Sequence, residues 1–442
     1  MTIQEFGAKL RAGTISSEEI NERCLARIAE SNQATNAFIL VMTEEARQQA
    51  READRELAAG HDRGPLHGVP LSIKDLMDVR GTETTAASRV RSGAVAREDA
   101  RCVAHLRAAG AVFVGKTNLH EYALGTTSGD SAFGAVRNPL DTTRSPGGSS
   151  GGSAVSVATG MALATVGTDT GGSIRIPAAC CGIVGLKPSF GEVSTDGVIP
   201  LSSTFDHAGP LATSVSDAWT MFRALTGDLA PRPLPGAAPS AMRLAVPRPY
   251  FCDMLDDDVR ARFEEALNAF RGAGMHISEI ALPHTETIAN VYIQISLKEA
   301  AAFHAPTLDT VPERYTPPVR QRLEMGRCIQ QEDYMLALGG REQLRRDVDA
   351  ALAGCDALVL PTLPIPAPKI GVEMVQVGPA QQPLRNVMLR LTQLFNITGH
   401  PAISIPCGLT REGMPCGLQL VGPRAQTGTL VQIALACEAV LA

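Results

Sequence analysis

Apolar residues recur at helical spacing in several segments of the chain. Segments 43–60 (TEEARQQAREADRELAAG), 99–110 (DARCVAHLRAAG) and 257–274 (DDVRARFEEALNAFRGAG) each carry an apolar face and end in glycine, which is typical of amphipathic helices. The same criteria predict a mostly helical region over 284–354 and a closing helix over 427–442.

Two further helices are predicted near polar and small residues. Ser16 stands three residues before Glu19, the spacing of a capping box, and predicts a helix that runs to about Glu30. Segment 153–164 (SAVSVATGMALA) is rich in small residues and predicts a helix packed tightly against its neighbours.

Short apolar runs bounded by glycine or proline predict buried strands. They lie within 67–81 (HGVPLSIKDLMDVRG), 111–115 (AVFVG), 356–368 (DALVLPTLPIPAP), 401–408 (PAISIPCG) and 416–423 (CGLQLVGP). Because helices and strands are mixed throughout the chain, we predict the α/β class. The Pro/Ala-rich stretch at 227–242 is the best candidate for a domain boundary. We interpret it as a surface loop, because strands needed for one sheet lie on both sides.

Composition narrows the class of protein further. The chain has 442 residues, of which 44% are hydrophobic and 19% charged, which is enough for a sizeable core. A net charge of −6 argues against nucleic acid or an anionic membrane as the main partner. The N-terminus lacks the apolar stretch of a signal peptide, and no segment predicts a membrane span. We therefore expect a cytoplasmic protein.

The cysteines and histidines do not predict a cofactor site. Ten cysteines occur without a CxxC pair, which indicates reduced and mostly buried thiols. The nine histidines form no HExxH motif and no Cys/His spacing suited to zinc. We expect neither a metal nor another cofactor.

Two short motifs have the residues of known functional sites but lack the predicted secondary structure that those sites require. Residues 110–117 (GAVFVGKT) fit the phosphate-loop pattern, yet a helix ends at the first glycine and the loop positions favour a strand. A nucleophile elbow has the pattern GxSxG. The segment GGSSG places Ser149 at the serine position and GSSGG places Ser150 there, yet no apolar strand precedes them. A Ser-His-Asp hydrolase stays an alternative, because five histidines lie downstream.

The lysines give a sharper signal. Only six occur, and Lys74, Lys116 and Lys187 each follow an apolar, strand-like run. A lysine that lies at a strand end and reaches solvent is the simpler interpretation for any one of them. A buried lysine can instead lose its proton and act as a base, which arginine cannot. Together with a glycine-dense GTDTGGSIRIP stretch, which can direct backbone N–H groups at one point, this pattern favours Ser/Lys nucleophilic catalysis.

The long motifs of the chain closely resemble those of the amidase signature family. The resemblance is carried by GVPLSIKDLMDVRG, KTNLHEYALGTTSGDSAFG, SPGGSSGGSAVSVATG and VGTDTGGSIRIPAACCGIVGLKPSFGEVS. It extends from about residue 15 to the C-terminal GMPCGLQLVG and is strongest over 65–210. It implies one domain over 1–442 built on a large mixed β-sheet with helices on both faces. Helices would occupy 1–64, the catalytic core 65–210, and a variable, mostly helical pocket region 227–400.

The resemblance also implies a catalytic machinery of the Ser–cis-Ser–Lys type. The nucleophile would be Ser173, the proton relay Ser149 and the base Lys74, with a cis peptide bond between Gly148 and Ser149. Backbone N–H groups would form the oxyanion hole, contributed by Thr170, Gly171 and Gly172. Support behind these residues would come from Ser150 and from a pair formed by Asp169 and Arg175, for which a purely structural ion pair is the simpler interpretation. Substrate contacts are expected from Gly125, Thr126, Thr127 and Ser128.

The family resemblance leaves more than one function open. We favour a stand-alone amidase acting on a small, neutral or hydrophobic amide, with esters and carbamates as further substrates and a homodimer left open. One alternative is the amidase subunit of a tRNA-dependent glutamine amidotransferase. Such subunits tend to carry an acidic residue that helps to hold glutamine, and by spacing that position is Leu389 here. The other alternative is a catalytically inactive assembly subunit.

Overall fold

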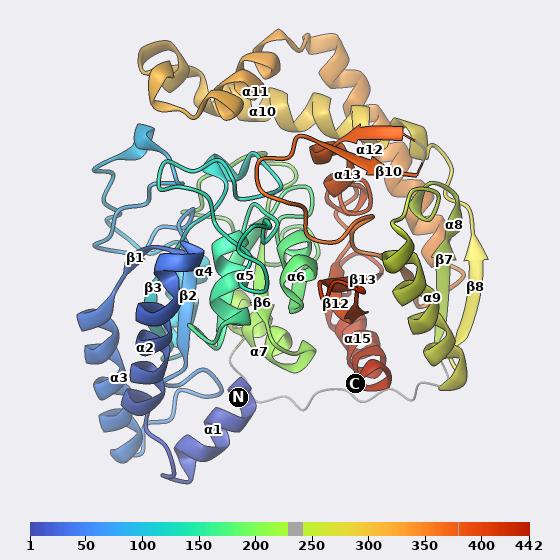
Figure 1. Cartoon of the computed structure of the whole chain (residues 1–442). Helices are drawn as coiled ribbons and strands as arrows, with labels where there is room; N and C mark the ends of the chain where they lie inside the picture. Colours follow the sequence, from blue (N-terminus) through green and yellow to red (C-terminus); the bar gives the residue numbers. More distant parts are fainter. Residues whose placement is uncertain (229–241, 379) are drawn as a thin grey trace.

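The computed structural model describes residues 1–228, 242–378 and 380–442. Its centre is an 11-stranded mixed sheet with the order β1-β3-β2-β4-β6-β5-β12-β13-β9-β7-β8. Helices flank this sheet on both faces, so the predicted α/β class and the mixed central sheet are confirmed (Figure 1). The expected loop at 227–242 lies largely outside the described residues. The strands on either side of it, β6 and β7, belong to the same sheet.

The strands of the large sheet are four to eight residues long. In chain order they are β1 Phe38–Val41, β2 Pro70–Lys74, β3 Val112–Thr117, β4 Ala164–Asp169, β5 Val184–Lys187, β6 His207–Ala212, β7 Arg243–Pro247, β8 His276–Ile280, β9 Ala357–Pro361, β12 Ala402–Leu409 and β13 Pro415–Val421. A separate two-stranded ribbon consists of β10 Met374–Val377 and β11 Ala380–Pro383.

The parallel part of the sheet determines where the chemistry can lie. Strand β2 pairs in parallel with β3 on one side and with β4 on the other. The carboxyl ends of these strands therefore meet at one edge of the sheet, which is where open α/β sheets place their ligands. Lys74 and Asp169 are the last residues of β2 and β4.

The predicted helical segments are present with shifted ends, and further helices such as α7 and α8 were not predicted. They are α1 Ile3–Arg11, α2 Ser17–Thr35, α3 Thr43–Ala58, α4 Arg101–Ala108, α5 Gly151–Ala158, α6 Arg175–Cys181, α7 Val215–Thr226, α8 Arg248–Phe251, α9 Asp257–Gly272, α10 Ile288–Thr310, α11 Pro317–Cys328, α12 Gln331–Leu352, α13 Leu384–Leu389, α14 Leu394–Ile397 and α15 Thr427–Leu441. Short 3₁₀ turns lie at Arg89–Arg91, Glu121–Ala123, Thr285–Thr287 and Pro312–Arg314.

Two predicted helix ends need correction. Helix α2 is capped as predicted, because the Ser16 side chain accepts a hydrogen bond from the Glu19 N–H at 3.0 Å. It continues to Thr35 and stops only where Asn36 adopts a left-handed conformation. Helix α5 ends at Ala158, before the second half of the predicted segment. The chain then turns at Gly160, whose φ is +71°, and enters β4.

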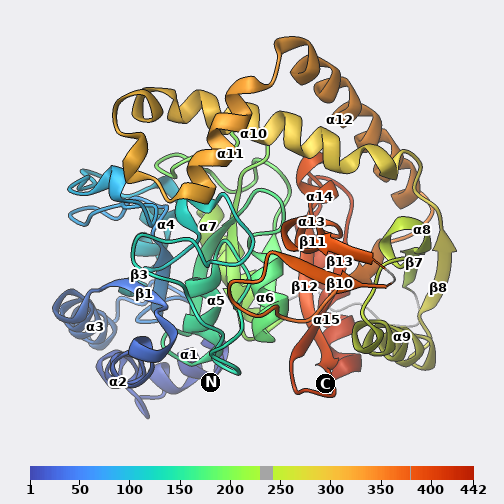
Figure 2. The same ribbon diagram turned by 45° about the horizontal axis from the view of Figure 1, so that its top comes forward.

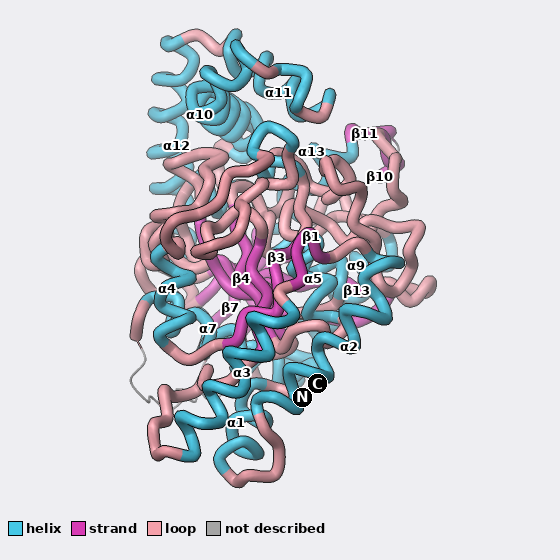
Figure 3. Tube along the Cα trace, turned by 90° about the vertical axis from the view of Figure 1, so that its left-hand side faces the viewer, coloured by secondary structure: helices cyan, strands magenta, loops and turns pink. Residues whose placement is uncertain are grey.

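Three of the helices form a separate layer at one end of the molecule. Helices α10, α11 and α12 extend across the top of the view in Figures 1 and 2. In Figure 3, loops fill the zone between these helices and the strands. Active sites are commonly built from loops held by a rigid scaffold, and the carboxyl ends of β2 and β4 lead into such loops.

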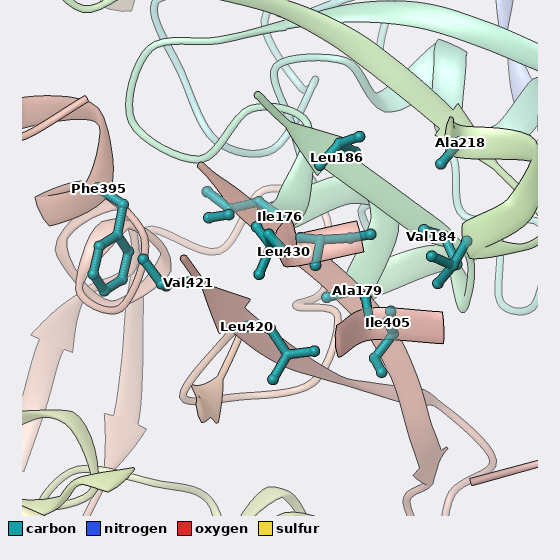
Figure 4. Close-up of a cluster of buried hydrophobic side chains, with 14 of the residues drawn as sticks. Ile176, Ala179, Val184, Leu186, Ala218, Phe395, Ile405, Leu420, Val421 and Leu430 are labelled. Carbon is teal, nitrogen blue, oxygen red and sulfur yellow. The ribbon is translucent and has the colours of Figure 1, made fainter. Parts of the chain in front are cut away.

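The hydrophobic core binds both halves of the sheet together. Figure 4 shows Ile176 and Ala179 of α6 beside Leu186 of β5 and Leu420 of β13, while α15 adds Leu430. All these side chains are buried. All ten cysteines are free thiols, as the sequence predicts. No helix among the described residues is long and apolar enough to cross a lipid bilayer.

Candidate active site

Lys74 lies at the end of β2 with no exposed surface. Its ammonium group contacts three hydroxyl oxygens, those of Ser149 at 2.8 Å, Ser150 at 2.8 Å and Thr168 at 2.7 Å. The two serines lie in the chain segment just before α5, and the threonine belongs to β4 beside Lys74. The structure thus brings together residues that are separated by up to 94 positions in sequence.

Burial changes the acidity of this lysine. Removal from water lowers the pKa of Lys74 from 10.5 to about 7, against the opposing effect of the Asp169 and Asp206 charges. A large share of Lys74 is therefore neutral near neutral pH. A neutral amine among hydroxyl groups can accept a proton, which is the property required of a general base.

The segment before α5 holds Ser149 through backbone contacts. The peptide bond between Gly148 and Ser149 is cis, as the family resemblance implies. The Ser149 carbonyl accepts hydrogen bonds from the His120 N–H and the Ser128 hydroxyl, each at 3.1 Å. A side chain at position 148 would not fit, because its Cβ would lie 2.8 Å from the Thr127 nitrogen. Within the described part of the chain no strand leads directly into this segment, so the arrangement is not a nucleophile elbow.

Ser173 lies in the loop between β4 and α6 and is 5% exposed. Among the described residues, its hydroxyl makes no hydrogen bond to a protein group, while its carbonyl accepts from the Ser150 N–H at 3.3 Å. The hydroxyl is thus free to approach a ligand. Ser150 is part of this network, because its hydroxyl also donates to the Thr168 carbonyl at 3.1 Å.

The glycines before Ser173 give the loop an uncommon backbone. Gly172 has φ +139°, and a Cβ there would lie 2.3 Å from the Thr392 hydroxyl. A Cβ on Gly171 would lie 2.5 Å from the Tyr292 hydroxyl and 2.9 Å from Leu389. Within the described parts of the chain, the N–H groups of positions 170–172 find no protein acceptor. Unpartnered N–H groups beside a free hydroxyl are what an oxyanion hole requires.

Asp169 and Arg175 form a fully buried ion pair beside this loop, with a shortest distance of 2.9 Å. Burial raises the pKa of Asp169, but Arg175 outweighs burial and holds that pKa below its ordinary value. The carboxylate also accepts the Ile174 N–H at 3.0 Å, and the guanidinium donates to the Thr392 carbonyl at 3.0 Å. The pair therefore holds both ends of the Ser173 loop in place through hydrogen bonds and makes no contact with Lys74.

Several residues of the site were not predicted from the sequence. Thr168 contacts Lys74, and Thr392 donates to the Gly171 carbonyl at 2.6 Å. Asp206 accepts a hydrogen bond from the Thr170 hydroxyl at 2.5 Å, and burial raises the pKa of this carboxyl to about 6. Thr168 stands next to Asp169 in the GTDTGG motif, so its place in the site could have been inferred from the sequence. Nothing in their local sequence marks the other two.

The four expected substrate contacts divide into two groups. Thr126 and Thr127 line a cavity of about 500 Å³ next to the serine segment. Gly125 and Ser128 are not part of this lining. A Cβ on Gly125 would collide with the ring of His120, and the Ser128 hydroxyl is engaged with the Ser149 carbonyl and the Gly151 N–H. For these two residues, contact with a substrate stays a prediction.

The fold and this site define the chain as an α/β enzyme with a buried lysine and two serines at the carboxyl edge of its sheet. The sequence profile of the Amidase family matches residues 19–431. The chain belongs to the amidase family and is an amidase, a hydrolase of carbon–nitrogen bonds.

Individual relatives agree over nearly the whole chain. A glutamyl-tRNA(Gln) amidotransferase subunit from Anaeromyxobacter sp. (strain K) is 38% identical, with 99% of this chain and 95% of that protein covered. A crystal structure described as an amidase superposes with TM-score 0.95 at 40% identity and covers all of both chains. The corresponding glutamyl-tRNA(Gln) amidotransferase subunit from Thermotoga maritima superposes with TM-score 0.79 at 30% identity, covering 99% of this chain and 94% of that one.

Proposed function

We propose that the protein hydrolyses the C–N bond of a small-molecule amide through an acyl-enzyme on Ser173. The observation that carries the proposal is the contact of a fully buried Lys74 with three hydroxyl groups and, among the described residues, with no carboxylate. Such a lysine has its pKa lowered to about 7 and has partners that can pass on a proton.

In the proposed reaction, Lys74 takes the proton of Ser149 while Ser149 takes the proton of Ser173. The Ser173 oxygen then attacks the amide carbonyl. The unpartnered N–H groups at 170–172 stabilise the negative charge that develops on the carbonyl oxygen. The relay returns a proton to the leaving nitrogen, and water repeats the sequence to release the acid. The Asp169–Arg175 pair positions the loop without exchanging protons.

Trapping the intermediate tests this proposal. The purified chain is mixed with an aryl amide such as p-nitroacetanilide, and both product release and the intact mass of the protein are followed. Ser173→Ala is expected to abolish turnover and to remove the acyl adduct. Ser203→Ala, a change at an exposed serine, serves as the matched control and retains both. An adduct that persists in Ser173→Ala would refute the assignment of the nucleophile.

A second candidate function is favoured by the curated relatives, whose names are those of glutamyl-tRNA(Gln) amidotransferase subunits. In that role the chain would release ammonia from glutamine within a larger assembly. Leu389 argues against it, because this buried apolar residue lies against Gly171 at the position where the family resemblance places an acid in such subunits. Ammonia release from glutamine but from no other amide would favour the amidotransferase role over the stand-alone hydrolase.

The alternative of a catalytically inactive protein makes a different prediction. It requires that the purified chain hydrolyse no amide and form no adduct on Ser173. The filled triad positions and the lowered pKa of Lys74 support an active enzyme instead.

A further inference from the structure

Residues 170–172, the oxyanion segment, have one side chain that can anchor them. Positions 171 and 172 are glycines, so this side chain belongs to Thr170. Thr170 is buried, and its hydroxyl donates to the Asp206 carboxylate at 2.5 Å. A second contact comes from the Thr392 hydroxyl, which donates to the Gly171 carbonyl at 2.6 Å. The direction of the Thr170 N–H group therefore depends on the bond to Asp206.

Asp206 is itself held in one position. It stands directly before β6, where His207 pairs with Asp169 at the end of β4. One carboxylate oxygen accepts the Thr170 hydroxyl, and the other accepts the N–H groups of Leu201 at 2.8 Å and Ser202 at 3.1 Å. Burial raises the pKa of Asp206 to about 6, so the group is charged at neutral pH and these bonds are charge-assisted. Asp206 thus connects the 201–206 turn to the oxyanion segment.

Glu299 on α10 holds the same turn from the other side. One of its carboxylate oxygens accepts the Ser202 hydroxyl at 2.6 Å and the Thr204 N–H at 3.2 Å. The other accepts the Thr204 hydroxyl at 2.8 Å and the hydroxyl of Tyr334 on α12 at 3.0 Å. Both oxygens are therefore occupied by donors. Glu299 connects the turn to the layer of helices that Figure 2 shows above the sheet.

Aromatic rings provide a second connection between α10 and the site. The ring of Phe205 in the 201–206 turn stacks on that of Tyr292 in α10, with centroids 5.9 Å apart and an interplanar angle of 10°. The Tyr292 hydroxyl would lie only 2.5 Å from a Cβ on Gly171. Helix α10 therefore contacts both the turn and the oxyanion segment, which restricts movement of one relative to the other.

We propose that Asp206 is a positioning residue for the oxyanion hole, and that Glu299 extends its support to α10 and α12. Through the Thr170 hydroxyl, Asp206 keeps the N–H groups of the oxyanion segment aimed at the carbonyl oxygen of the substrate. Donors that stabilise a developing negative charge must be aimed before the reaction starts, and a small misplacement removes much of their effect. The inference rests on the proposed acyl-enzyme on Ser173.

Substitutions at Thr170 test this role with little change of shape. Thr170→Val removes the hydroxyl, Thr170→Ser keeps it, and Thr195→Val at an exposed threonine is the matched control. With p-nitroacetanilide, kcat of Thr170→Val should fall by about 10- to 100-fold while KM changes by less than about twofold, because the oxyanion exists only in the transition state. Thr170→Ser should recover most of this loss, and the control should match the wild type. A wild-type kcat in Thr170→Val, or a loss confined to KM, would overturn the proposal.

A double-mutant cycle tests whether Asp206 acts through Thr170. Asp206→Ala removes the acceptor, so adding Thr170→Val to it should cost less than about twofold more in kcat. Glu299→Gln places an amide N–H₂ group against donors and should lower kcat by about 3- to 10-fold. Far-UV spectra check that the variants are folded. Losses that multiply in the double mutant would overturn the link between the two residues, and if Asp206→Ala does not fold, the comparison at Thr170 decides.

Binding of phenylboronic acid provides a measurement that does not depend on turnover. The Ser173 oxygen adds to boron while its proton passes to Ser149 and Lys74, and a boronate oxygen then occupies the oxyanion hole. Calorimetry should show binding to the wild type that Thr170→Val weakens by about 10- to 100-fold and Thr170→Ser largely restores. Equal affinity in Thr170→Val, or no binding to the wild type, would overturn the proposal. If no amide is hydrolysed, the proposed function fails, and this binding experiment alone decides about the role of Asp206.

Discussion

Replacement of Lys74 by methionine should separate the stability effect of a buried cation from the catalytic use of the same side chain. Lys74 is fully buried, and methionine has a similar length without a charge. Its three hydroxyl partners would lose a hydrogen-bond donor, which costs stability, while removal of the buried amine relieves a desolvation cost that is largest at low pH. The pH dependence of stability is therefore more informative than its value at one pH.

The size of that pH dependence follows from the two pKa values of the lysine. In an unfolded chain a lysine titrates near about 10.4, and in this fold the pKa of Lys74 is about 7. Between these values the unfolded state binds more protons than the folded state, so the free energy of unfolding rises with pH. From pH 7 to about 9.5 the wild type should gain about 3 kcal/mol from this residue. The methionine variant should gain none of it.

Urea unfolding at pH 7 and about pH 9.5 measures this difference, with Lys9→Met on the exposed side of α1 as the matched control. The control should follow the wild type at both pH values. In parallel, kcat/KM of the wild type should rise up to about tenfold per pH unit below about pH 7 and level off above it. A stability difference that is the same at both pH values, or an activity independent of pH between about 5.5 and 8, would refute a neutral Lys74.

Three further substitutions test the surroundings of the triad. Asp169→Asn leaves Arg175 buried without its carboxylate and should lower the free energy of unfolding by about 3–5 kcal/mol, measured by urea titration. Gly172→Ala forces a Cβ toward the Thr392 hydroxyl and displaces the N–H groups of the loop, so kcat should fall by about 100-fold with a retained far-UV spectrum. Ser150→Ala removes one of the hydroxyls on the lysine and should lower kcat by about 10-fold, while the acyl adduct still forms; an unchanged kcat would show that this contact is only structural.

Much of the framework could be predicted from local sequence. The helices at Thr43–Ala58 and Arg101–Ala108 and the strand at Pro70–Lys74 follow from periodicity and from glycine stops. Rejection of the phosphate loop is also confirmed, because Val112–Thr117 is a strand. Strand β6, His207–Ala212, was not predicted from the sequence. It contains a glycine and a proline, both of which lower strand propensity, yet it lies in the middle of the sheet.

The candidate site was predictable only as far as the long motifs extend. The motifs name the lysine and the serines, because each of these residues stands inside a long motif that carries the family resemblance. Thr392 and Asp206 reach the Ser173 loop from distant parts of the chain, and single polar residues in those segments carry no local pattern.

Comparison of the three strand-end lysines explains why Lys74 is suited to act as a base. All three are fully buried, and burial lowers the pKa of each. Lys116 lies 2.6 Å from the Asp75 carboxylate, a charge pair that favours the protonated amine. Lys187 donates to two backbone carbonyls, which cannot pass a proton onward, and contacts a buried histidine ring. The partners of Lys74 are instead hydroxyl groups, each able to donate a proton and to accept another. Burial therefore makes a neutral lysine available, and the choice of partner decides whether its proton can reach a nucleophile.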